Sequence, residues 1–187
     1  MKAVLVSLKP YYYYLVGEGI KKIEVRKGMP KAEDWNRDTF FYMSKDEKSF
    51  AKIPKEFQEK YRKHFGKVGL QFVCGRIDKI GWFSSPNKVD WKDNYNEETC
   101  LTNGETYEYT KGNIFYEWHI SNLEIYDTPK ELSEFKRFCD GGKKGCDDCD
   151  YYYLENSESG RYEECCCDNL RPLKRPFESW GYVEVEQ

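Results

Sequence analysis

The stretch that decides the predicted fold is Gly19-Ile20-Lys21-Lys22-Ile23-Glu24-Val25-Arg26. Apolar Ile23 and Val25 alternate here with charged Glu24 and Arg26, and an alternation with a period of two residues is typical of a β-strand. The strand carries a glutamate and an arginine on one face, and Lys21 lies just before it. A small polar pocket needs such groups to hold an anion or to move a proton, so the stretch also marks a candidate site.

The residues before this stretch predict a strand, a short helix and a turn that lead into it. Residues 3–8 are apolar or small and indicate a buried strand. Lys9-Pro10 then opens a short helix that runs to Val16, since proline is favourable in the first turn of a helix. Gly17 and Gly19 end that helix, so the expected order is strand, short helix, glycine turn, strand.

The rest of the chain predicts further short elements. The expected strands are residues 39–43, 67–80, 114–126 and 180–186, and the expected helical segments are 55–64, 102–110 and 130–135. A bulge is expected near Gly75-Arg76, where the alternation changes phase. Thr128-Pro129 is expected to end the strand at residues 114–126. Five or six strands with a few short helices predict an α+β fold built on a mixed β-barrel.

Composition limits the class of protein. A chain of 187 residues predicts a single domain, 1–187, with an appendage. Aromatic residues make up 17% of it, which suits a small barrel with a core of large side chains. The net charge of −3 argues against a general electrostatic grip on duplex nucleic acid. No apolar run reaches the length of a membrane span and no signal peptide is recognisable, so we expect a cytoplasmic protein with no membrane partner.

Cysteines form the second chemical signal. Of eight cysteines, six lie between Cys139 and Cys167, and Cys146-Asp147-Asp148-Cys149 has the C-x2-C spacing of a zinc knuckle. Free thiols in a mobile acidic loop are the alternative, and a redox pair is disfavoured because the two aspartates would raise thiol pKa. We predict a structural zinc ion in which one cysteine of the triplet 165–167 completes the site. The expected ligands are Cys139, Cys146, Cys149 and Cys167.

Several motifs in order resemble those of the ASCH domain family of the PUA-like superfamily. They are Ser7-Leu8-Lys9-Pro10, Gly19-x-Lys21-x-x-Glu24-x-Arg26, residues 116–121 and residues 175–184, of which the last two resemble a phage and gut-metagenome branch. The resemblance implies a PUA-like β-barrel with short flanking helices, a cleft that holds the lysine, glutamate and arginine, and a cysteine-rich insertion at 136–170 before the last strand. Members of the family are thought to bind RNA or modified nucleosides, and some are hydrolytic.

One departure from the family bears on the predicted activity. An amidohydrolase branch that acts on acetylated cytidine uses a lysine, a threonine three residues later and a glutamate on a later strand. Lys21 matches the lysine, but Glu24 stands where the threonine is expected. This difference argues against the amidohydrolase function.

We therefore expect a module that binds RNA or a small nucleotide-like ligand. The expected ligand-binding residues are Ser7, Lys9, Lys21, Glu24, Arg26, Trp118 and Trp180. The alternative for the charged trio is a solvated ion pair on an exposed strand face. Trp118 would either stack on a base or pack in the core, and His119 must point to the opposite strand face.

Two other functions remain open at this stage. In a hydrolase, either a ribonuclease or an amidohydrolase, Lys21 would act as the base and Glu24 as the acid or orienting group, with Glu117 a candidate second carboxylate. The phage-like branch also suggests an accessory protein in a host cytoplasm that sequesters a host nucleotide or blocks a host protein.

Overall fold

The computed structural model describes residues 2–31, 38–81, 93–137 and 171–185. They form a mixed α+β fold around one eight-stranded sheet. Across the sheet the strands are β2 (Ile23–Arg26), β7 (Phe115–Lys130), β4 (Val68–Ile80), β3 (Asp38–Met43), β1 (Lys2–Leu8), β10 (Trp180–Val185), β8 (Phe135–Arg137) and β9 (Arg171–Pro172).

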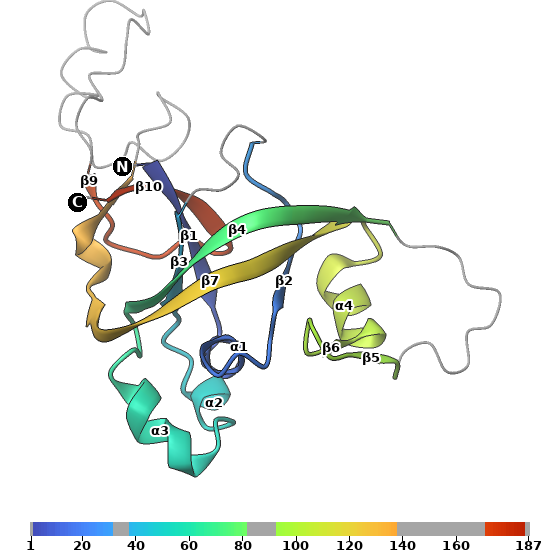
Figure 1. The fold of residues 1–187 in the computed structure, drawn as a ribbon, viewed down its shortest axis with the longest axis horizontal. Coiled ribbons are helices and arrows are strands. Elements are labelled where there is room, and N and C mark those ends of the chain that lie inside the picture. The colour runs from blue at the N-terminus through green and yellow to red at the C-terminus, as the bar shows by residue number, and fades with distance from the viewer. Residues whose placement is uncertain (1, 32–37, 82–92, 138–170, 186–187) are drawn as a thin grey trace, which may run out of the picture.

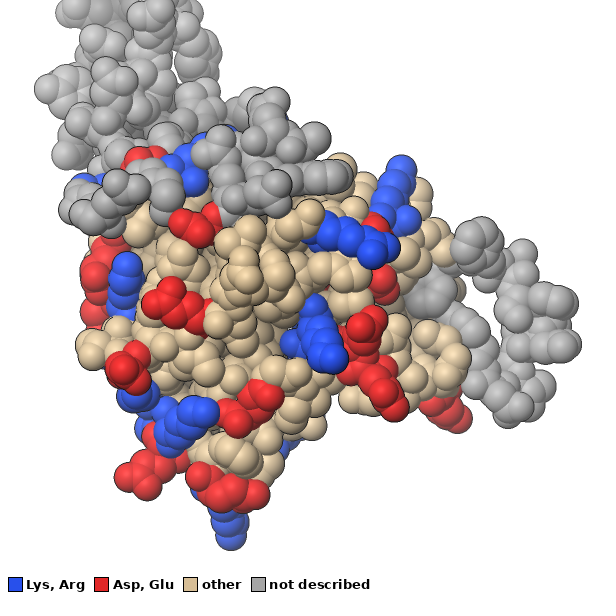
Figure 2. Space-filling view, viewed as in Figure 1, with Lys and Arg blue, Asp and Glu red and all other residues tan. Residues whose placement is uncertain are grey.

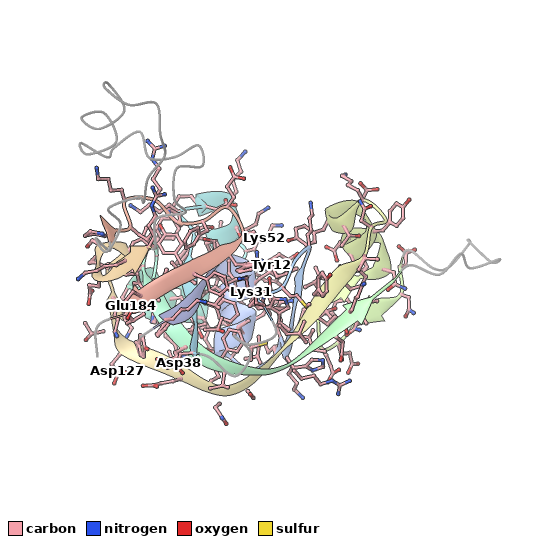
Figure 3. The ribbon with its side chains drawn as sticks, turned by 90° about the horizontal axis from the view of Figure 1, so that it is seen from above. Tyr12, Lys31, Asp38, Lys52, Asp127 and Glu184 are labelled. Carbon is pink, nitrogen blue, oxygen red and sulfur yellow. The ribbon has the colours of Figure 1, made fainter. Side chains whose placement is uncertain are left out.

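The sheet is strongly curled but does not close into a barrel among the described strands. Only β1 and β3 pair in parallel, and every other ladder of the sheet is antiparallel. The order of strands has two ends, β2 and β9, with no ladder joining them. Figure 3 shows the resulting trough from above. The predicted mixed β-barrel is therefore corrected to an open, curled sheet.

Short helices and a hairpin cover the ends of the trough. Figure 1 shows α1 below the arch made by β4 and β7, with α2 and α3 beneath it. The β5–β6 hairpin and α4 lie beyond β2. These elements are α1 (Pro10–Gly17), α2 (Glu47–Phe50), α3 (Lys55–Arg62), β5 (Tyr95–Asn96), β6 (Leu101–Thr102), α4 (Asn103–Thr110) and η2 (Leu132–Glu134). No helix in the described part of the chain is long and apolar enough to cross a membrane.

The core lies on both faces of the sheet, because alternate residues of β1 point to opposite sides. Val4 and Val6 belong to an inner cluster that includes the α1 tyrosines and Trp118. Leu5 belongs to an outer cluster with Phe135 of β8. Burial on both faces explains why β1 is almost continuously apolar.

The predicted strands are confirmed, with one difference in length. The register between β4 and β7 shifts between Cys74 and Arg76, where a bulge is expected from the sequence. However, β7 continues to Lys130 instead of ending at Thr128-Pro129. A second register shift, opposite Gly69, leaves the proline outside the regular pairing, so its missing N–H does not end the strand.

Candidate functional site

Two glycines take the chain from α1 into β2. A side chain at Gly17 would collide with the ring of Tyr61, and Gly19 has a φ of +68°, which favours glycine. The backbone N–H of Lys21 then donates to the carbonyl of Leu15 at 3.0 Å. This turn directs the Lys21 side chain into the protein, where the residue is 2% exposed.

Glu24 lies between two cations at the centre of the site. Lys21 Nζ is 3.4 Å from Glu24 Oε2, and Arg26 Nη2 is 2.8 Å from Glu24 Oε1. Both Glu24 and Arg26 are 6% exposed. The trio is thus a buried ionic network rather than the solvated ion pair that the sequence left open. One carboxylate for two cations leaves an excess positive charge away from water, which is unfavourable unless an acceptor offsets it.

The β5–β6 hairpin holds the lysine from the other side. Lys21 Nζ donates to the carbonyl oxygen of Thr99 at 2.5 Å. The neighbouring carbonyl of Glu98 accepts hydrogen bonds from the N–H groups of Lys22 and Ile23 at 2.8 and 2.9 Å. These bonds attach the hairpin to the start of β2, so the position of the ammonium group depends on both segments.

Arg26 bridges the open side of the sheet. Its Nη2 donates to the carbonyl of Ser7 on β1 at 2.7 Å, and its Nη1 donates to Ser179 Oγ, just before β10, at 3.3 Å. The N–H of Ser7 in turn donates to the carbonyl of Ser179 at 2.9 Å. The side chain therefore joins β2 to β1 where no backbone ladder does. The buried Nε of Arg26 has no hydrogen-bond partner among the described residues.

These groups lie in a pocket of about 340 Å³. Its walls come from the end of β1, the first turn of α1, β2, the hairpin with α4, and the segment before β10. The lining residues are Ser7, Leu8, Lys9, Tyr12, Lys21, Glu24, Val25, Arg26, Leu101, Glu105, Tyr109 and Glu178. The pocket thus combines buried charges with apolar and aromatic walls, as small-molecule sites do.

Two tyrosines supply the aromatic walls. Tyr12 is labelled in Figure 3, and Lys21 Nζ is 5.6 Å from the centre of its ring. Burial, followed by the negative charges of Glu105 and Glu24, raises the pKa of the Tyr12 phenol, which keeps it a neutral hydrogen-bond donor. Tyr109 lies on the α4 side, with Lys27 Nζ 4.8 Å from its ring centre.

The structure brings together five of the seven residues expected to bind a ligand. Those that line the pocket are Ser7, Lys9, Lys21, Glu24 and Arg26. Neither tryptophan is in its lining. Trp118 is fully buried in the inner core, with its ring 5.6 Å from that of Trp180 in an edge-to-face arrangement. It therefore has no exposed face on which a base could stack, and it occupies the core position that was the alternative prediction.

The α4 wall of the pocket was not expected from the sequence. Leu101, Glu105 and Tyr109 come from a segment that is distant from β2 in the chain, and no local pattern indicates that it docks there. Tyr12 is different, because the tyrosine run 11–14 is conspicuous and its helix is expected to follow the first strand. The closeness of this run to Lys21 in the chain is the sequence signal that indicates Tyr12 as a pocket residue.

Glu117 and His119 lie on the other side of β7 from the pocket. In the β2–β7 ladder Glu24 is opposite Trp118, whereas Val25 is opposite Glu117. Directly opposed residues share a face, so Glu117 points away from Glu24. It does not line the pocket, and the candidate second carboxylate of a hydrolase is therefore absent from its lining. Burial raises the pKa of Glu117, and Asp78 adds to that effect while His119 opposes it.

The predicted zinc ligands, Cys139, Cys146, Cys149 and Cys167, lie outside the described residues. The zinc knuckle therefore stays a prediction. The cysteines that the structure describes, Cys74 and Cys100, are buried free thiols.

The sequence matches no protein-family model and no curated protein. Among solved structures, the fold is similar to a crystal structure of an ASCH protein from Zymomonas mobilis. That match has 14% identity over 68% of this chain and 69% of the other, with a TM-score of 0.40. A mutant of the same protein matches at 15% identity over 69% of this chain and 73% of the other, with a TM-score of 0.43. Similarity this low is not evidence of a shared ligand or activity.

Proposed function

We propose that the pocket binds a nucleotide-like small ligand or one unpaired base of an RNA strand. The observation that carries this proposal is the buried Nε of Arg26, a donor with no partner among the described residues. Native proteins rarely leave such a group unpaired, because its desolvation costs about 1–3 kcal/mol. Arg26 lines the pocket, so a rotation of its side chain would bring this donor to a ligand atom that accepts a hydrogen bond. Such an acceptor would also offset the excess positive charge.

The remaining lining supports a base rather than a simple anion. Glu24 offers acceptor atoms next to the donors of Lys21 and Arg26, so the pocket presents both kinds of hydrogen-bonding group. A heterocycle carries donors and acceptors on one edge, whereas an inorganic anion has only acceptors. Tyr12 and Tyr109 supply aromatic surface for its flat faces.

Size and surface charge restrict the ligand further. A volume of about 340 Å³ is near the lower end of small-molecule pockets, which range from about 300 to 1,000 Å³, and suits one nucleoside. On the face shown in Figure 2, acidic and basic side chains are interspersed and form no broad basic field. Together with the net charge of −3, this favours a short strand or a free nucleotide over long duplex.

A ligand screen tests the proposal. The purified chain is analysed by thermal shift and native mass spectrometry against nucleosides, nucleotides, cyclic dinucleotides and short RNAs. We expect at least one ligand to bind, and Lys21→Met to weaken its binding about ten-fold or more, since a charged hydrogen bond contributes about 1.5–3 kcal/mol. The matched control is Lys22→Met, which removes the exposed lysine next in the chain and should leave binding unchanged. Silence across the panel would contradict the proposal.

The hydrolase and sequestering alternatives use the same pocket and differ in the fate of the ligand. A ligand whose mass changes in the screen would indicate a hydrolase and make Lys21 and Glu24 its candidate catalytic residues. A ligand that stays intact in a tight complex would support binding or the sequestering of a host nucleotide.

The zinc prediction has its own test. We expect about one equivalent of zinc per chain by elemental analysis, and its loss in Cys146→Ser, because a structural site needs all four thiolates. A zinc-free protein of equal stability would contradict it.

A further inference from the structure

A second group of chemically active side chains lies on the face of the sheet opposite the pocket. In the β4–β7 ladder Asp78 is directly opposite Glu117, and Arg76 is directly opposite His119. Because opposed residues share a face, and residues two apart in a strand do so too, all four side chains are on the same side. Each is at least partly exposed to solvent.

Three of these side chains form a ligand set for a metal ion. The donor atoms of Asp78, Glu117 and His119 all lie within 4.8 Å of one another, and His119 Nε2 is 2.9 Å from Asp78 Oδ2. Bonds of about 2.0–2.2 Å to one ion would place such atoms about 3–4 Å apart. Small side-chain rotations would therefore bring all three donors to a common centre.

Glu117 is left unexplained by the contacts that the structure describes. Its carboxylate makes no hydrogen bond or ion pair with any described residue, although it is only partly exposed. It also lies directly opposite Asp78, and like charges in directly opposed positions destabilise an antiparallel pair. Arg76 and His119 both contact Asp78 rather than Glu117. A cation held between the two carboxylates would relieve this repulsion.

Arg76 is already paired with Asp78, so its guanidinium would compete with that cation for the carboxylate. Its Nε and Nη2 donate to Asp78 Oδ1 and Oδ2 at 3.0 and 2.8 Å. Its side chain is nevertheless 70% exposed, and exposed ion pairs contribute only about 0–1 kcal/mol. The guanidinium can therefore leave Asp78 at little cost when a divalent ion arrives.

We propose that Asp78, Glu117 and His119 form a binding site for a divalent cation, with Arg76 as the group that the cation displaces. Two carboxylates and one imidazole suit Mn²⁺ and related ions, and three protein ligands leave coordination positions open to water. The site is separate from the nucleotide pocket, since it lies on the other face of β7 and shares no residue with the pocket lining.

Titration of the full-length chain with Mn²⁺, followed by electron paramagnetic resonance, tests this site. Thiolates prefer softer metals, so the choice of Mn²⁺ limits interference from the cysteine-rich segment. We expect one site per chain, and we expect Asp78→Asn, Glu117→Gln and His119→Gln each to weaken it about ten-fold or more. Glu124→Gln removes an exposed carboxylate elsewhere on β7 and serves as the matched control.

Arg76→Ala gives the sharper test, because it distinguishes a metal site from a structural cluster. If Arg76 competes with the cation, its removal strengthens Mn²⁺ binding, whereas the other three substitutions weaken it. Absence of Mn²⁺ binding, unchanged affinity in His119→Gln, or weaker binding in Arg76→Ala would each overturn the proposal.

Discussion

Two charged clusters lie on opposite faces of the sheet, in very different surroundings. On the inner face Lys21, Glu24 and Arg26 are almost fully buried, and both cations are paired with the one carboxylate of Glu24. On the outer face Glu117 is partly exposed and makes no ion pair with any other described residue. Both clusters come from strands in which alternate side chains point to opposite faces. The difference in burial therefore determines how firmly the side chains of each cluster are held. The inner cluster has a fixed geometry, whereas the outer one is free to exchange partners.

The largest effect is expected from removing the carboxylate of the inner cluster. Glu24→Gln leaves two buried cations without their counter-charge, and breaking a buried pair in this way costs about 3–5 kcal/mol. Urea unfolding of the variant and the wild type measures the loss in the free energy of unfolding. A loss of less than about 1 kcal/mol, the usual value for exposed pairs, would mean that the inner cluster is not held as tightly as its burial indicates.

A smaller effect is expected from a histidine in the inner core. His64 is 1% exposed, and Tyr13 Oη lies 3.0 Å from its Nδ1. Burial, and then the nearby charges of Lys63 and Lys60, lower the pKa of His64 to about 4 from 6.5. Between these values the unfolded chain binds more protons than the folded one. The stabilising contribution is therefore complete above pH 6.5 and is lost as the pH falls toward 4.

The free energy of unfolding at pH 7 and pH 4.5 measures this loss. We expect His64 to account for about 2 kcal/mol of the decrease, from the shift in its pKa. His64→Gln, which cannot be protonated in this range, should show a decrease smaller by that amount. An equal decrease in both proteins would show that His64 is not buried in its neutral form.

The bridge made by Arg26 predicts a loss of about 1–2 kcal/mol in Arg26→Lys. Lysine keeps the charge but cannot reach Glu24, Ser7 and Ser179 together, because it lacks the planar fork of arginine. Urea unfolding again measures the change. Full stability in the lysine variant would mean that charge alone, and not the bridge across the open side of the sheet, holds β2 in place.

The smallest effect, of opposite sign, is expected on the outer face. In buffer with a chelator, Glu117→Gln removes a like charge from the position opposite Asp78 and should stabilise the protein by up to about 0.5 kcal/mol. A loss of more than about 1 kcal/mol would show that Glu117 has a structural role and that the two faces do not differ as described.

Local patterns made much of the inner cluster predictable. Alternation placed Glu24 and Arg26 on one strand face, and the two glycines indicated the turn that precedes Lys21. The alternation of apolar and charged residues does not show which face of the strand is buried when one face carries charges. From the sequence alone, an exposed ion pair is therefore an alternative. That question is decided by the curl of the sheet, which depends on long-range pairing.

Features that join distant segments were not predictable from the sequence. The α4 wall of the pocket and the pairing of Asp78 with Glu117 depend on the register of strands far apart in the chain. The predicted end of a strand at Pro129 was wrong because a register shift between β4 and β7 leaves the proline outside the regular pairing. The predicted barrel was wrong because, among the described strands, no backbone ladder joins β2 to a strand beyond β7; only the side chain of Arg26 connects β2 to β1.

Calorimetric titration of the best ligand from the screen into wild-type protein and Arg26→Lys tests the central claim most directly. The Nε of Arg26 has no hydrogen-bond partner in the described part of the chain, which is the reason to expect a ligand in this pocket. The substitution removes that donor while keeping the charge. We predict one ligand per chain and a loss of affinity of about ten-fold or more in the variant. Equal affinity in the two proteins would show that the ligand does not bind through Arg26 and would contradict the proposed site.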